Sequence, residues 1–176
     1  MNALGIDPGQ AGAMVVEGHD GPYYWAAWSM LRRKGGNVWR CVDSSRVASE
    51  QPTMTHAVKW AIQSAPPLRV AAVETWATGS GAKTAAARDG MVRAGGVAQA
   101  VVELHRPGVP VLWVQAPTWR RDVLRLRSTA REAAERVAVE RMLGEGWTLT
   151  QPPAWATVHV AEARGIALWG RRHGTT

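Results

Sequence analysis

Cysteine is almost absent from this sequence, and so are long apolar runs. Cys41 is the one cysteine among 176 residues, so no internal disulfide can form and no CxxC pair is present for zinc or redox chemistry. No stretch approaches the roughly 18 apolar residues that cross a bilayer, and no basic segment followed by a long apolar one opens the chain. We therefore expect a protein of the reducing cytoplasm, neither secreted nor associated with a membrane.

Acidic residues are also few relative to basic ones. The chain has 14 acidic and 21 basic residues, which gives a net charge of +7 and a pI near 10.7. Polyanions are therefore plausible partners, with nucleic acid first among them, although a basic surface can also be merely solvated. Apolar residues make up 46% of the chain, as in ordinary globular proteins, and the length suits one core. We expect a single domain over residues 1–176.

The order of apolar patterns predicts a mixed sheet flanked by helices. Strands are expected at residues 3–7, 12–17, 22–30 and 38–43, and then at 68–74 and 109–114. The last two are apolar runs without alternation, which is typical of strands covered on both faces. Helices are expected at 54–63, 83–104, 117–125, 128–143 and 157–171. The basic sequence RRKGGN, residues 32–37, is expected to form a turn between two strands.

Two acidic residues stand where expected buried strands end. Asp7 lies in LGIDPG, where Pro8 disfavours the helical conformation for Asp7 and keeps it extended. Glu74 ends VAAVE. If their strands are neighbours, a strand separation of about 4.8 Å lets both carboxylates share a cation. The alternatives are that Asp7 is a turn residue and that Glu74 is an exposed strand end.

The last expected helix adds a histidine and a third acid. In TVHVAEARGIALWG, His159 and Glu162 are three residues apart and share one helical face. Oxygen ligands with one imidazole suit Mg²⁺ or Mn²⁺, and two such ions about 3.5–4 Å apart are the arrangement used for phosphodiester cleavage. A solvated helix face or a local ion pair is the alternative. Together with Asp7 and Glu74, the pair favours a metal site.

Three motifs in this order resemble the RuvC-type Holliday junction resolvases of the ribonuclease H-like superfamily. They are LGIDPG, VAAVE and HVAEARGIALWG, and they span almost the whole chain. The stretch APTWRRDVLRLRSTAREAAERVA is similar to the corresponding region of phage-borne relatives. The resemblance implies an α/β, ribonuclease H-like nuclease domain with a mixed five-stranded sheet flanked by helices. The first three strands are antiparallel in that fold and the later ones parallel.

The resemblance also implies a function. Asp7, Glu74, His159 and Glu162 map onto the catalytic residues of the family, where they hold two Mg²⁺ ions, with Mn²⁺ able to substitute. A homodimer then binds a four-way DNA junction and makes two symmetric nicks that leave 5′-phosphate and 3′-hydroxyl ends. Such an enzyme serves DNA recombination and repair or phage DNA processing, in a bacterial cell or a phage-infected host, and it needs no nucleotide cofactor.

Three positions depart from the family pattern. Glu162 stands where Asp is common, which can alter the metal preference. Arg131 is the nearest candidate for a lysine that is often present in the preceding helix, and its fixed charge can contact phosphate but cannot serve as a proton donor. Trp76 lies one position earlier than the aromatic residue that the bacterial enzymes place near the unstacked bases of the junction.

Basic and aromatic residues give the expected DNA contacts. The main candidates are Trp76, Lys83, Arg88, Trp119, Arg120, Arg121 and Arg131. Further basic residues that could contact phosphates are Arg32, Arg33 and Lys34 in the expected turn, with Arg93, Arg125 and Arg127. Five other tryptophans are expected in the core: Trp25, Trp28, Trp39, Trp113 and Trp169.

Three other functions remain open. A less selective branched-DNA or flap endonuclease of the same fold fits the same residues. A non-catalytic DNA-binding protein would keep the fold, although all four ligand positions carry residues that can bind a metal. A sugar-kinase or actin-like ATPase also begins with a strand, an Asp and glycines, but it needs two related halves and a second phosphate loop, and the sequence contains neither.

Overall fold

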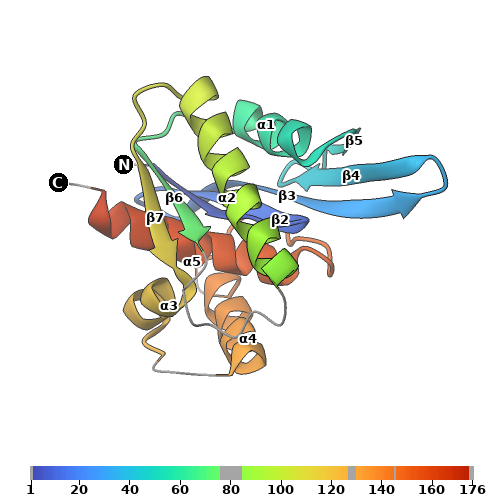
Figure 1. The fold of residues 1–176 in the computed structure, drawn as a ribbon. Coiled ribbons are helices and arrows are strands. Elements are labelled where there is room, and N and C mark those ends of the chain that lie inside the picture. The colour runs from blue at the N-terminus through green and yellow to red at the C-terminus, as the bar shows by residue number, and fades with distance from the viewer. Residues whose placement is uncertain (1, 76–84, 127–129, 145, 175–176) are drawn as a thin grey trace.

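A seven-stranded mixed sheet lies at the centre of the structure, a computed structural model that describes residues 2–75, 85–126, 130–144 and 146–174 (Figure 1). The strands are β1 (Ala3–Asp7), β2 (Ala11–Glu17), β3 (Pro22–Arg33), β4 (Gly36–Asp43), β5 (Ala48–Gln51), β6 (Val70–Thr75) and β7 (Val111–Gln115). The helices are α1 (Met54–Ser64), α2 (Ala85–His105), α3 (Ala116–Leu124), α4 (Arg131–Met142) and α5 (Thr157–His173).

The strand order across the sheet is β5-β4-β3-β2-β1-β6-β7. Strands β1 to β5 form an antiparallel meander, and β6 and β7 continue from β1 as parallel neighbours. This confirms the predicted mixed sheet with helices around it. The sheet has seven strands, whereas the family resemblance implies five and the apolar pattern predicts six. The strand that the pattern missed is the edge strand β5. The residues of β5, Ala-Ser-Glu-Gln, lack the apolar alternation that identifies a strand in sequence.

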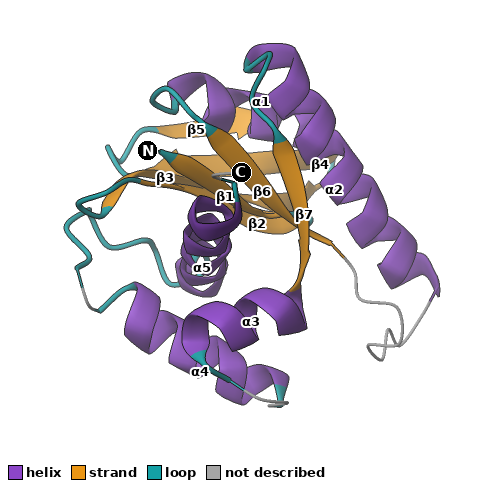
Figure 2. Cartoon of the chain, turned by 90° about the vertical axis from the view of Figure 1, so that its left-hand side faces the viewer, coloured by secondary structure: helices purple, strands orange, loops and turns teal. Residues whose placement is uncertain are grey.

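Helices cover both faces of the sheet (Figure 2). α1 and α2 pack together on one face, over a core that includes Leu4, Ile6 and Val73. α5 crosses the other face against β1, β2 and β6, and α3 and α4 pack against α5. No helix in the described part of the chain is both long and apolar enough to span a membrane.

A glycine in the first strand allows α5 to lie directly on the sheet. A Cβ built on Gly5 would lie 2.1 Å from the carbonyl oxygen of Ala163 and 2.2 Å from the amide nitrogen of Ala167, so a side chain there would push α5 away. Gly5 is two residues before Asp7, and Ala163 directly follows Glu162. This backbone contact therefore fixes the height of α5 above the end of β1.

The expected basic turn at 32–37 is shorter in the structure. Strand pairing continues to the pair Arg33 and Gly36, which leaves Lys34 and Gly35 as a two-residue loop. Gly36, the first residue after this loop, has a φ of 127°, which is in the region that favours glycine. The segment is therefore a long β-hairpin with a basic tip.

Four of the five tryptophans expected in the core pack against it. Trp25 and Trp28 are buried, and Trp39 and Trp169 are partly buried against the two core clusters. Trp113 was predicted wrongly, because its side chain is 41% exposed on β7. β7 is an edge strand, so its apolar run is covered less completely than that of a central strand.

Candidate metal centre

The candidate site lies where β1 and β6 end side by side. The parallel pairing runs from Ala3 with Val70 to Ile6 with Val73, so the next residues, Asp7 and Glu74, stand at the same level of neighbouring strands. Both are buried, at 6% and 8% exposure. The sequence predicted both strand ends, and the pairing of β1 with β6 brings the two acids to one edge of the sheet.

The beginning of α5 brings His159 and Glu162 to the same place. Nδ1 of His159 lies 2.6 Å from Oδ2 of Asp7. One ligand atom from each of Asp7, His159 and Glu162 lies within 4.8 Å of the others. Residues 152 positions apart in the chain thus meet because α5 rests on β1. The structure thus groups three of the four predicted ligands, and Glu74 lies outside this group at the neighbouring strand end, where the charges of Asp7 and Glu162 act on it.

Glu74 is hydrogen-bonded to Trp119, a residue expected from the sequence to contact DNA. Nε1 of Trp119 donates a hydrogen bond of 2.7 Å to Oε2 of Glu74. The expectation that Trp119 touches DNA is wrong, because its side chain is 0% exposed. A Cβ on Gly165 would lie 2.6 Å from the Trp119 ring, so this glycine in α5 provides the space for the indole. Trp119 is therefore a core residue that orients a candidate ligand.

The residue after Trp119 contacts a second candidate ligand. The guanidinium of Arg120 forms an ion pair and a hydrogen bond with Oε1 of Glu162, and both side chains are largely buried. Because Trp119 and Arg120 are adjacent, the short helix α3 supplies a neutral donor to one carboxylate and a cation to another. Sequence reasoning named both residues but gave neither of these contacts.

Burial and mutual repulsion raise the pKa of two of the carboxyl groups. Burial, followed by the charges of Asp7 and Glu162, raises the pKa of Glu74 to about 8. Burial and the charge of Asp7 raise the pKa of Glu162 to about 7, although Arg120 opposes the shift. Burial works to lower the pKa of His159, but the hydrogen bond and charge of Asp7 and the charge of Glu162 outweigh it and raise that pKa.

A further acid near the site was missed. Glu135 of α4 is partly buried, and its charge contributes to the raised pKa values of His159 and Glu162. Its carboxylate accepts a hydrogen bond of 2.6 Å from Arg131, one turn earlier in the helix. The four-residue spacing of this pair was the available signal. The hydrogen bond and charge of Glu135, with smaller contributions from the charges of Glu162 and Asp7, raise the pKa of the Arg131 guanidinium.

The donor set fits a divalent cation. Two carboxylates and one imidazole converge, with the carboxylate of Glu74 on the neighbouring strand end, and oxygen ligands of this kind suit Mg²⁺ or Mn²⁺. Burial and the neighbouring carboxylates raise the pKa values of Glu74 and Glu162 although Arg120 opposes both shifts, so the ionised forms are disfavoured without a cation. A bound cation would favour the ionised forms of both carboxyl groups.

The other expected DNA contacts divide into two groups. Trp76 and Lys83 lie outside the described residues, as does the side chain of Arg88. Arg121 and Arg131 are exposed, although each forms a local ion pair, with Asp122 and Glu135 respectively. Both guanidinium groups therefore face solvent, where a polyanion can reach them.

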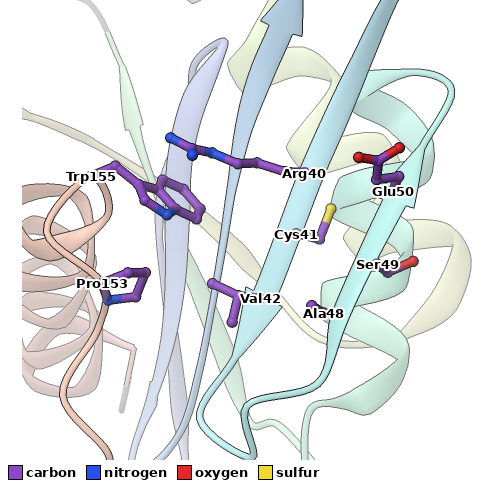
Figure 3. A pocket seen from close by; sticks show the side chains of 8 residues that line it. All are labelled: Arg40, Cys41, Val42, Ala48, Ser49, Glu50, Pro153 and Trp155. Atoms are coloured by element: carbon purple, nitrogen blue, oxygen red, sulfur yellow. The ribbon is translucent and has the colours of Figure 1, made fainter.

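A separate cavity of about 470 Å³ lies against β4 and β5, next to the segment that leads into α5 (Figure 3). Its lining includes Arg40, Glu50, Pro153 and Trp155, and none of the four candidate ligands. The guanidinium of Arg40 lies 4.1 Å from the centre of the Trp155 ring, as a cation–π pair. This cavity is distinct from the carboxylate cluster.

Comparison with known proteins gives a structural match. No protein-family model matches the sequence, and no curated protein matches it. The structure of Thermus thermophilus RuvC is similar, with 18% identity, a TM-score of 0.52, and coverage of 99% of this chain and 98% of that one. A structure of T. thermophilus RuvC in complex with a Holliday junction substrate is similar at 16% identity, with a TM-score of 0.52 and coverage of 99% and 97%. The chain therefore shares the fold of these RuvC structures, as the motifs predicted.

Proposed function

We propose that this chain is a metal-dependent, structure-selective DNA endonuclease that cuts branched DNA, chiefly four-way junctions. The observation that carries the proposal is the meeting of Asp7 and Glu74 with His159 and Glu162 at one edge of the sheet. Four groups of these types, gathered from three distant segments, are a donor set for divalent cations. The shared fold supports DNA as the substrate, since one matched structure holds a Holliday junction.

Each side chain has a role in this proposal. Asp7, Glu74, His159 and Glu162 hold two divalent ions, which supply activation of water and stabilisation of the charge that develops on the phosphate and the leaving oxygen. Trp119 keeps the Glu74 carboxylate in one orientation through its hydrogen bond. The fixed positive charges of Arg120, which pairs with Glu162, and of the exposed Arg131 are the proposed contacts to the phosphate that is cut.

The proposed assembly is a homodimer that makes one nick per subunit. The described part of the chain leaves several large apolar side chains exposed on the α2 and β7 side of the sheet. They are Val92, Leu104 and Trp113. We propose this side as the subunit interface, because a second subunit there would bury these apolar groups. A second copy bound on this side would give the dimer two carboxylate clusters, one for each nick. The molar mass of the protein in solution tests whether the dimer forms.

The deciding experiment is an incubation of the purified protein with labelled four-way junctions, flaps and linear duplex, each with Mg²⁺, Mn²⁺ or EDTA. We expect paired nicks in the junction with either metal and none in EDTA. Asp7→Asn should abolish the cleavage, because it removes a ligand charge without changing the shape of the side chain. Asp20→Asn is the matched control, since Asp20 is an exposed acid outside the site.

Each other result has a definite meaning. Absence of metal-dependent cleavage on every branched substrate contradicts the nuclease and favours the non-catalytic DNA-binding protein. Cleavage that Asp7→Asn leaves unchanged contradicts the assigned site. Cleavage of flaps but not junctions favours the less selective branched-DNA endonuclease.

A further inference from the structure

The β3–β4 hairpin extends past the carboxylate edge of the sheet. β3 runs in the same direction as β1, because each is antiparallel to β2. Through Ala13, Asp7 is level with Ala27 of β3, and β3 continues for six more residues to Arg33. At roughly 3.3 Å per residue, the tip lies about 20 Å farther along the strand than the level of Asp7.

The outer part of this hairpin has no neighbouring strand. β2 pairs with β3 only as far as Ser29, and β5 pairs with β4 only from Trp39 inward. Residues 31–38 therefore form a free two-stranded ribbon, which projects from the body of the molecule in Figure 1. We call these residues the hairpin arm. A free ribbon of this kind is a shape that fits a groove or backbone of double-stranded DNA.

The tip of the hairpin arm is strongly basic. Arg32, Arg33 and Lys34 are consecutive and exposed, and no acidic residue occurs between Asp20 and Asp43. Arg33 forms an ion pair with Glu50 of β5. In the part of the chain that the structure describes, Arg32 and Lys34 form no ion pair. Two positive charges at the tip are therefore available to phosphates.

Two contacts join the hairpin to the rest of the protein, one near its tip and one on β4 just inward of the arm. The Arg33–Glu50 pair joins the arm to the edge strand β5. Farther in, Arg40 of β4 lies over the ring of Trp155, just before α5 (Figure 3). Because α5 carries His159 and Glu162, the arm is connected through one short segment to the helix that completes the carboxylate cluster. The position of the tip is thus set relative to the site.

We propose that the hairpin arm binds the phosphate backbone of one duplex branch of the DNA substrate, through Arg32 and Lys34. This inference rests on the proposed nuclease function and extends it to a second contact on the same DNA molecule. A tip about 20 Å beyond Asp7 reaches phosphates about six base pairs from the one at the carboxylates, at roughly 3.4 Å per base pair. The hairpin arm therefore favours substrates that carry a full duplex next to the cleavage point.

The test compares two variants of equal charge. R32Q/K34Q removes the two unpaired cations of the tip. K59Q/R69Q removes two exposed cations that lie outside the hairpin arm, Lys59 in the middle of α1 and Arg69 just before β6. Binding is measured in EDTA with a four-way junction whose arms are longer than the hairpin can reach. Thermal unfolding of both variants confirms that they are folded.

We expect R32Q/K34Q to weaken junction binding about tenfold near 0.1 M salt and to reduce the salt-dependence slope by about 2. K59Q/R69Q should change affinity by less than about threefold, because its charges lie away from the bound DNA. If both double variants weaken junction binding equally, the proposal is overturned, because the cations of the hairpin arm then act only through the net charge of the protein. Unchanged affinity of R32Q/K34Q would overturn it as well.

A second measurement locates the contact on the DNA. Junctions carry one uncharged methylphosphonate at successive positions along an arm, so that each lacks a single phosphate charge. In wild-type protein, we expect a loss of affinity when the methylphosphonate lies about six base pairs from the phosphate at the carboxylates, and this loss should disappear in R32Q/K34Q. A loss that persists in the variant contradicts the contact. Because these are binding measurements, they remain decisive for the hairpin arm even if cleavage, and with it the nuclease, is not observed.

Discussion

Trp119 and Glu74 are joined by a hydrogen bond of 2.7 Å from the indole Nε1 to the carboxylate Oε2, and the indole is completely buried. The donor comes from α3 and the acceptor from the end of β6. A hydrogen bond to an ionised acceptor in a site of low exposure is stronger than one between neutral groups. The indole therefore opposes the burial that raises the pKa of Glu74 and fixes the direction of its carboxylate.

We predict that Trp119→Phe weakens metal-dependent cleavage about 10- to 100-fold, because the variant keeps most of the ring but loses the donor. The loss should appear as a higher metal concentration for half-maximal rate. The free energy of unfolding should fall by about 1–3 kcal/mol from the smaller ring. A metal titration of the cleavage rate, with a urea unfolding curve, checks both values.

Trp25→Phe is the matched control for this variant. Trp25 is equally buried, and its Nε1 donates a hydrogen bond of 2.9 Å to the carbonyl oxygen of Thr150, away from the carboxylates. It should lose a similar amount of stability without any change in metal dependence. Equal metal dependence in the two variants would contradict the positioning role of Trp119.

Gly165→Ala tests the same hydrogen bond from the opposite side. The new Cβ would lie 2.6 Å from the Trp119 ring, so the indole must move away from Glu74. We expect lower stability, by about 1–3 kcal/mol, and a loss of cleavage similar to that of Trp119→Phe. Gly96→Ala is the control, since a Cβ there meets nothing within 4 Å and should stabilise α2 by about 0.4–1 kcal/mol. Normal cleavage by folded Gly165→Ala would contradict the link from α5 to Glu74.

The metal-free protein should become less stable as pH rises from about 5 to 8. The pKa values of Glu74 and Glu162 are raised to about 8 and about 7, so between the unfolded and folded pKa values the native state binds more protons than the unfolded state. Stability is then lost as pH rises. The raised pKa of His159 has the same sign, because its folded form also retains a proton to higher pH. Urea unfolding in EDTA at several pH values measures the slope.

Asp7→Asn provides the check on this pH dependence. The charge of Asp7 contributes to the raised pKa of both Glu74 and Glu162, so its removal should lower both values and flatten the slope. A slope that is unchanged in the variant would show that the destabilisation arises outside the cluster.

Divalent cations should stabilise the protein more at pH 8.5 than at pH 6. Metal ligands must be deprotonated, and Glu74 and Glu162 retain protons at the lower pH. At about 100 times the dissociation constant, a bound ion adds about 2.7 kcal/mol to the free energy of unfolding. The melting temperature with Mg²⁺ or Ca²⁺ against EDTA gives this difference, and Asp7→Asn should reduce it. An equal gain at both pH values would indicate a site formed by other residues.

The sequence by itself determined the elements that carry the candidate ligands. Pro8 keeps Asp7 at the end of β1, and the uninterrupted apolar run before Glu74 identifies a buried strand. The spacing of His159 and Glu162 places both on one face of a helix. These are local effects of chain geometry and hydrophobic pattern, and neighbouring residues suffice to reveal them.

Only the tertiary structure decided which distant residues meet. Trp119 and Arg120 look like a DNA-binding pair in sequence, yet the packing of α3 against α5 buries one against Glu74 and pairs the other with Glu162. Trp113 has the pattern of a core residue but lies on an edge strand, where fewer elements cover it. Contacts of this kind depend on how whole helices pack on the sheet, and the hydrophobic pattern of a single segment carries no information about its partner.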